Sequence, residues 1–141
     1  MITEDYCSFK VAELLKEKGF DEPCRTYYQD GEFVNTVCTQ YYQWNSKSPF
    51  GHISAPTLQM AMKWLREAHQ LHISVDINPI YGKTKNEKGR STCGLLYWHY
   101  MASGEWLNEK RDPFKKAFVV SAKSYEEAVE AALKYVLENL I

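Results

Sequence analysis

The sequence lacks most of the motifs that identify a small enzyme or a metal protein. Its four cysteines include no C-x-x-C pair, and a structural zinc site usually needs such a pair. No P-loop, G-x-S-x-G or G-x-G-x-x-G motif occurs, so neither a phosphate cradle nor a nucleophile is indicated. No apolar run approaches the length of about 18 residues that crosses a membrane. We therefore expect no cofactor and no membrane partner, and the sequence favours a protein that is not an enzyme.

An excess of charge of one sign is also lacking. The chain carries 17 Lys and Arg against 18 Asp and Glu, which gives a net charge of −1. This balance provides no overall attraction to nucleic acid or to an anionic membrane surface. The first ten residues contain Glu4 and Asp5 and no apolar run, so they do not resemble a signal peptide. We expect a cytoplasmic protein whose thiols stay free and reduced.

Aromatic residues, in contrast, are abundant. They make up 14% of the 141 residues and include ten Tyr and four Trp. Tyr and Trp pack well in cores, and they also favour binding surfaces because each joins an apolar body to a polar tip. The length fits a single globular domain over residues 1–141, long enough to bury a sizeable core.

The strongest structural signal is a helix predicted over residues 56–69. Pro56 suits the first helical position, because a proline there loses no needed hydrogen bond. On a helical wheel the apolar residues form a wide arc, so we expect neighbours to cover this helix on more than one side. The residues of this arc are Leu58, Met60, Ala61, Met62, Trp64, Leu65, Ala68 and His69.

Two further helices are predicted near the ends of the chain. The first covers residues 9–18, with Ser8 as the N-cap and Gly19 as the left-handed residue that ends it. The last begins with a capping box, in which Ser124 and Glu127 satisfy each other's backbone donors.

Strands are predicted between these helices. Asp30-Gly31 is typical of a two-residue hairpin turn, and the pairing is expected to extend through residues 39–44 before a loop at 45–52. Apolar and polar residues alternate over residues 71–77, which predicts a strand with one buried and one exposed face. The remaining β-prone segments are residues 92–101, followed by a turn at Ser103-Gly104, and residues 117–120.

Short turns between strands do not leave room for parallel crossovers, so the sheet should be mostly antiparallel. The order of elements therefore predicts an α+β fold with about three helices, in which the central helix 56–69 packs on the sheet.

His69, His72 and Asp76 are the candidates for a metal site. His72 and Asp76 fall on the same face of the predicted strand, and His69 ends the preceding helix. Two imidazoles and a carboxylate could hold a metal ion or form a general base with its orienting partner. The H-x-x-H spacing across a helix-to-strand junction matches no known ligand motif, and a histidine near a helix end commonly bonds a free carbonyl.

The candidates for ligand binding are a basic loop and a group of aromatic residues in the strand that follows it. Four basic residues against Glu87 give residues 83–90 a local excess of positive charge. If these segments converge, the basic side chains could neutralise phosphates while an aromatic ring stacks on a base. The residues are Lys83, Lys85, Lys88 and Arg90 in the loop and Tyr97, Trp98 and Tyr100 in the strand.

Three segments carry a resemblance to a group of proteins: ISAPTLQMAMKWLRE at residues 53–67, YEEAVEAALKY at 125–135 and LLKEKGF at 14–20. Together they resemble short proteins encoded by phages and prophages of Bacteroides-like bacteria. The resemblance implies a phage or prophage accessory protein that acts in the cytoplasm of the bacterial host. It implies no catalytic residue, because the shared positions are helix caps and core faces.

Our leading hypothesis is a non-enzymatic binding module that counters host defence by binding a host protein or a small nucleotide. One alternative is a nucleic-acid-binding protein that uses the basic 83–90 loop and the strand aromatics. The other is a metal-assisted hydrolase built on His69, His72 and Asp76. All three hypotheses leave open whether the protein forms a homo-oligomer.

Overall fold

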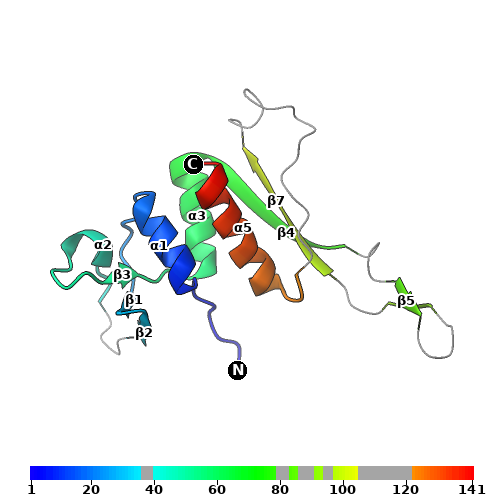
Figure 1. Ribbon diagram of the computed structural model, residues 1–141, viewed down its shortest axis with the longest axis horizontal. Helices are drawn as coiled ribbons and strands as arrows, with labels where there is room; N and C mark the ends of the chain where they lie inside the picture. The colour runs from blue at the N-terminus through cyan, green and yellow to red at the C-terminus, as the bar shows by residue number, and fades with distance from the viewer. Residues whose placement is uncertain (36–39, 79–82, 86–90, 94–96, 105–121) are drawn as a thin grey trace. The chain divides into compact units, whose positions relative to one another are not determined.

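The structure is a computed structural model that describes residues 1–35, 40–78, 83–85, 91–93, 97–104 and 122–141 (Figure 1). The chain divides into two compact units. The first consists of Met1–His69 and Leu133–Ile141, and the second of Gln70–Ala132. Helix α5 (Tyr125–Asn139) contributes residues to both units. The expectation of a single domain stays a prediction.

Helix α1 (Phe9–Glu17) opens the first unit and has the predicted ends. The Ser8 hydroxyl accepts a hydrogen bond from the Val11 N–H at 3.3 Å, as an N-cap should. After the helix, Gly19 adopts a φ of +91°, and the Phe20 N–H donates to the Leu15 carbonyl at 2.9 Å. This is a Schellman ending, which turns the chain and buries Phe20.

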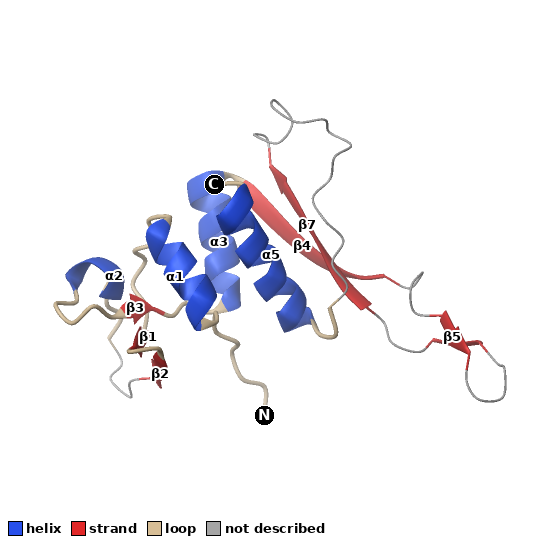
Figure 2. Ribbon diagram, viewed as in Figure 1, coloured by secondary structure: helices blue, strands red, loops and turns tan. Residues whose placement is uncertain are grey.

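A three-stranded antiparallel sheet follows, in the order β2-β1-β3 (Figure 2). It consists of β1 (Thr26–Gln29), β2 (Glu32–Asn35) and β3 (Ile53–Ser54). Asp30 and Gly31 connect β1 and β2 with φ values of +50° and +79°. These are the positive values that a two-residue hairpin turn of this kind requires, so the predicted hairpin is confirmed.

The expected continuation of the strand through residues 39–44 is wrong in the part that the structure describes. Tyr42 makes only an isolated bridge with Cys24, and a short helix α2 (Trp44–Lys47) begins two residues later. The side chains of Gln43 and Asn45 both donate to carbonyl groups of the segment before β1. These bonds draw the chain back towards that segment instead of along an extended path.

The central helix α3 covers Leu58–His69. Thr57 is its N-cap, because its hydroxyl accepts from the Met60 N–H at 3.2 Å. The prediction that Pro56 is the first helical residue is therefore wrong, because the helix begins two residues later and Pro56 precedes the cap. The Pro56 carbonyl accepts from the Cys7 N–H at 2.9 Å. The predicted apolar face is confirmed for five buried residues, Leu58, Ala61, Met62, Trp64 and Leu65, whereas Ala68 is exposed.

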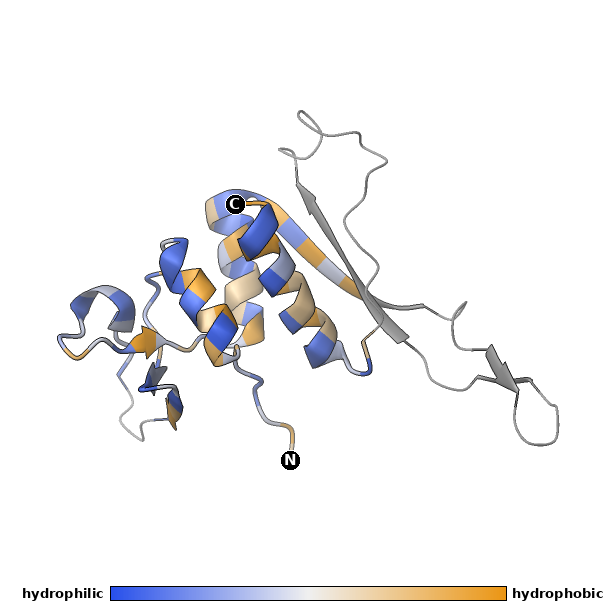
Figure 3. Cartoon of the chain, viewed as in Figure 1, coloured by the Kyte–Doolittle hydropathy of each residue, from blue (hydrophilic) through white to orange (hydrophobic). Residues whose placement is uncertain are grey.

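The second unit contains strand β4 (Leu71–Asn78), which pairs antiparallel with β7 (Tyr97–Gly104) along its whole length. Leu71 and Ile73 are buried and His72 is exposed, which confirms the predicted alternation (Figure 3). The turn expected at Ser103-Gly104 is wrong, because both residues belong to β7. The strand expected at residues 117–120 lies outside the described residues.

The same unit contains a second antiparallel strand pair, between β5 (Lys83–Lys85) and β6 (Ser91–Cys93). Helix α5 begins with the Ser124 hydroxyl accepting from the Glu127 N–H at 3.1 Å. The Glu127 carboxylate accepts in return from the Lys123 N–H, one residue earlier than the capping box predicts. The predicted apolar face is buried throughout and consists of Ala128, Val129, Ala132, Leu133, Val136 and Leu140.

The predicted α+β class is confirmed. The described residues contain four helices, and every strand pair among them is antiparallel. These strands form one three-stranded sheet and two separate two-stranded sheets. None of the helices that can be described combines the length and the apolar character needed to cross a membrane.

Candidate functional site

Five rings of the first unit form a connected cluster around β1, which we call the Trp44 cluster. The Tyr27 ring lies 4.2 Å from the Trp44 ring and 4.4 Å from the His52 ring, and these two rings lie 5.6 Å from each other. Tyr42 contacts Trp44 at 4.8 Å, and Phe50 contacts His52 at 5.8 Å. Favourable ring pairs usually have centres about 4.5–7 Å apart, and the two Tyr27 contacts are slightly closer than this, so the five side chains are in direct contact and support one another.

The segment that carries Tyr42 and Trp44 is fixed to the chain just before β1. Tyr42 and Cys24 exchange two backbone hydrogen bonds, at 2.9 and 3.0 Å. Side chains of the same segment add five more bonds to that part of the chain. These are Gln43 Nε2 to the Asp21 carbonyl and to the Asp21 carboxylate, Trp44 Nε1 to the Cys24 carbonyl, Asn45 Nδ2 to the Phe20 carbonyl and Ser46 Oγ to the Asp21 carboxylate. The cluster therefore has a defined geometry before any partner binds.

The cluster is buried on its inner side and accessible on its outer side. His52 is 7% exposed, whereas Tyr42 is 38% and Phe50 is 78% exposed. Tyr41, next to Tyr42, is 57% exposed and lies under the Arg25 guanidinium, 4.7 Å from its ring centre. Isolated exposed aromatic residues are ordinary, but aromatic side chains gathered around one fixed segment are typical of a binding surface.

His52 contributes a polar group to this cluster. Its Nδ1 lies 2.9 Å from the Ser48 hydroxyl, and which of the two atoms donates depends on the tautomer. The other ring nitrogen, Nε2, is buried and has no hydrogen-bond partner among the described residues. A buried nitrogen of this kind costs free energy until a partner supplies the missing bond.

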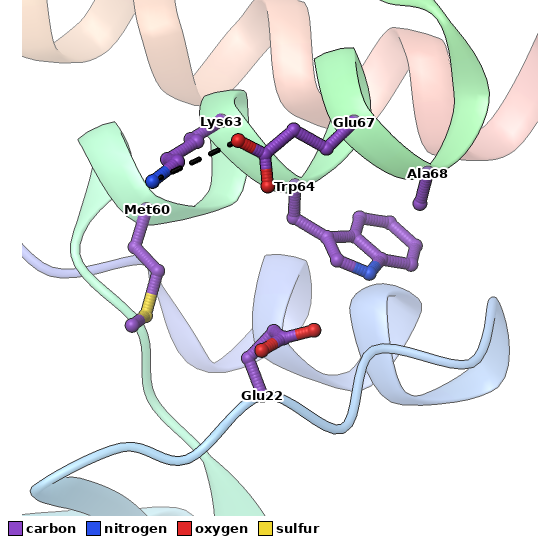
Figure 4. Close-up of a pocket in the computed structure, with 6 residues that line it drawn as sticks. All are labelled: Glu22, Met60, Lys63, Trp64, Glu67 and Ala68. Atoms are coloured by element: carbon purple, nitrogen blue, oxygen red, sulfur yellow. Dashed lines mark ion pairs between the residues drawn. The ribbon is translucent and has the colours of Figure 1, made fainter.

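A separate pocket of about 320 Å³ lies on the exposed side of α3 (Figure 4). We call it the Trp64 pocket. The Lys63 ammonium and the Glu67 carboxylate form an ion pair across one helical turn at its edge, 3.7 Å apart. Glu22, from the segment before β1, faces the helix from the opposite wall. The lining residues are Glu22, Met60, Lys63, Trp64, Glu67 and Ala68.

The basic residues predicted for ligand binding divide into two groups. Lys83 and Lys85 lie on β5, paired in register with Cys93 and Ser91, so this part of the predicted loop is a strand. Lys88 and Arg90 lie outside the described residues. The predicted convergence of this basic segment with an aromatic strand stays a prediction.

The three predicted aromatic residues all belong to β7. Trp98 and Tyr100 occupy the register positions opposite Ile77 and Val75, and Tyr97 lies opposite Asn78. Their part in ligand binding stays a prediction.

The candidates for metal binding lie at the junction of α3 and β4. His69 packs edge-on against Trp64, with ring centres 4.7 Å apart. His72 and Asp76 occupy β4 and are paired in register with Ser103 and His99. No three His, Cys, Asp or Glu side chains within the described ranges are arranged to hold a metal ion.

The Trp44 cluster was missed in the sequence, because residues 45–52 were expected to be loop. Its only sequence signal was the density of aromatic residues from Tyr41 to Trp44. Phe50 and His52 join the cluster because of the path that the chain takes after Trp44. No local sequence pattern predicts that path. The tertiary hydrogen bonds to residues 20–24 determine that path.

Comparison of the chain with models of protein families, with curated proteins and with solved structures gives no match. The resemblance to phage and prophage proteins therefore stays a prediction, as does any activity that it implies.

Proposed function

We propose that the protein is a non-enzymatic binding module that recognises a host protein through the Trp44 cluster. The observation that carries this proposal is the fixed position of accessible aromatic side chains. Phe50 and Tyr42 are exposed, yet their neighbours Trp44 and His52 are held by hydrogen bonds and ring contacts. Aromatic anchors on a rigid support are typical of the residues that dominate protein interfaces.

Rigidity favours binding because association must otherwise order the side chains that make contact. Each mobile side chain costs about 0.5–1.5 kcal/mol when it is immobilised. The seven hydrogen bonds that join residues 42–46 to residues 20–24 have already met part of this cost in folding. Exposed aromatic rings on a surface, unlike rings that line an enclosed cavity, favour a protein over a small nucleotide as the partner.

The phage or prophage origin is part of the proposal and rests on the resemblance of residues 53–67, 125–135 and 14–20. A phage accessory protein that binds a host protein would act by blocking it, and host defence is the process that we propose it counters. Expression of the protein in a bacterium that carries a defence system should raise the plating efficiency of a restricted phage. An unchanged efficiency across defence systems would remove this part of the proposal.

The binding surface is tested by comparing two substitutions of exposed aromatic residues. Phe50→Ser changes the Trp44 cluster, whereas Phe33→Ser changes a ring that is 41% exposed and contacts Tyr6 and Tyr28 instead. We expect wild type and Phe33→Ser to retain the same host protein from a bacterial lysate, and Phe50→Ser to lose it. Both variants should keep the melting temperature of the wild type to within a few degrees.

Three outcomes would contradict the proposal. Equal retention by Phe50→Ser would show that the Trp44 cluster is not the contact surface. Concentration-dependent dimerisation that Phe50→Ser abolishes, measured by light scattering, would identify a second copy of the chain as the partner. A nucleotide released from the purified protein and detected by mass spectrometry would favour the small-ligand version of the hypothesis.

A further inference from the structure

The Trp64 pocket exists because part of the apolar arc of α3 is left uncovered. Ala68 is exposed and Met60 is half-buried, although both belong to the arc that the sequence predicts to be covered. Trp64 is 9% exposed, because Phe20 and His69 pack against its ring at 5.5 and 4.7 Å. The pocket therefore has an apolar floor on a helix whose other side is core.

The rim of the pocket is acidic. Glu22 and Glu67 contribute two carboxylates, and Lys63 contributes one ammonium group, which leaves a local charge of −1. The ion pair of Lys63 with Glu67 is exposed and 3.7 Å long, so it holds neither side chain tightly. No hydrogen bond or ion pair from any described residue engages the Glu22 carboxylate.

We propose that the Trp64 pocket binds the side chain of one arginine from a partner polypeptide. The inference does not rest on the function proposed for the Trp44 cluster, because it uses other residues and a different kind of contact. The volume of about 320 Å³ lies at the lower end of ligand pockets, which suits one side chain and not a whole cofactor.

Arginine matches both properties of the pocket. Its aliphatic stem would lie on Met60, Trp64 and Ala68, as the stems of long basic side chains do on apolar surface. Its guanidinium would then reach the rim, where its five fixed donors can serve the two carboxylates, Glu22 and Glu67. An apolar side chain would fill the floor but leave the Glu22 carboxylate without a partner.

The test is a titration followed by NMR, with N-acetyl-arginine amide as the probe. We expect saturable shifts confined to the amides of Glu22 and of residues 60–68 and to the indole N–H of Trp64. The matched neutral probe is N-acetyl-citrulline amide, which has nearly the same shape and no charge. It should bind at least about five times more weakly, since a charge-assisted hydrogen bond is about twice as strong as a neutral one.

Three variants at exposed positions test the individual residues. The same spectra verify that each variant folds. Glu22→Gln should weaken arginine binding about three- to tenfold, the loss of one charged contact. Lys63→Gln should strengthen it, because it removes the competing ammonium and frees Glu67. Glu17→Gln, on α1 and outside the pocket, is the control for the general effect of charge and should change little.

The proposal is overturned if both probes bind equally, if the shifts lie outside the pocket, or if neither probe causes shifts. It is also overturned if Glu22→Gln and Glu17→Gln have the same effect, because the attraction would then be unspecific. Loss of host-protein binding in Phe50→Ser bears only on the Trp44 cluster, so failure of the two proposals can be told apart.

Discussion

The indole N–H of Trp44 donates a hydrogen bond to the backbone carbonyl of Cys24 at 2.8 Å. The same carbonyl accepts the Tyr42 N–H at 3.0 Å, so the main chain of one buried residue, Cys24, anchors the segment through both a side-chain and a main-chain donor. The Trp44 ring reaches Tyr27 from this anchored position. The exposed aromatic surface is thus an extension of the core.

The contribution of this bond can be measured with Trp44→Phe. Phenylalanine retains most of the ring contact with Tyr27 and removes the N–H donor, while the Cys24 carbonyl keeps its second bond. We expect a loss of about 0.5–1.5 kcal/mol in the free energy of unfolding, the usual net value of one hydrogen bond. Urea unfolding measures it. A variant as stable as wild type would show that the bond does not hold the segment.

Gly19→Ala tests the end of α1. Gly19 has a φ of +91°, and a methyl group placed on it would meet no atom within 4 Å. The cost should therefore come from backbone strain alone, about 1 kcal/mol. Gly19→Asn should cost less, because asparagine tolerates the left-handed conformation better than alanine does. Equal stability of all three proteins would contradict the Schellman ending as a source of stability.

Leu65→Ala tests the buried face of α3. Leu65 is fully buried, so its truncation leaves a cavity and should cost about 2–5 kcal/mol. Its matched control is Lys63→Ala, on the exposed face of the same helix. That change loses only an exposed ion pair and should alter stability by a few tenths of a kcal/mol. Small and equal effects at both positions would mean that the buried face is misassigned.

Local patterns in the sequence predict the helices and the first hairpin well. Ser8, Gly19 and Ser124 are found in the capping positions expected of them, and Asp30-Gly31 forms the expected turn. These features depend on a few neighbouring residues, so sequence alone can identify them. Pro56 is the exception: Thr57 lies next to it and supplies the cap that a proline lacks.

The candidate site was much harder to predict. The Trp44 cluster brings together Tyr27 and Phe50, which are far apart in the chain, through side-chain bonds to backbone carbonyls. Such bonds leave no periodic signal. Ala68 shows the opposite case: the helical wheel places it in the apolar arc, but only the tertiary structure shows that the described residues leave it exposed.

The last prediction concerns the Cys24 thiol, which is buried beside the Trp44 cluster. Burial, and next the negative charge of Glu22, raise the pKa of Cys24 from 9.0 to about 12. The folded protein therefore keeps this proton in a pH range where the unfolded chain releases it. The stability that this provides is complete below about pH 9 and is lost as the pH rises from 9 towards 12.

Cys24→Ala removes this titration while leaving the tyrosines and lysines that ionise in the same range. We expect the wild type to be the more stable protein at pH 8, since alanine leaves a small cavity. The difference in the free energy of unfolding should shrink between pH 8 and pH 10.5, measured by urea unfolding under reducing conditions. Because other alkaline titrations contribute equally to both proteins, only the thiol can produce that change. A difference that stays constant with pH would mean that Cys24 ionises as readily in the folded protein as in the unfolded chain.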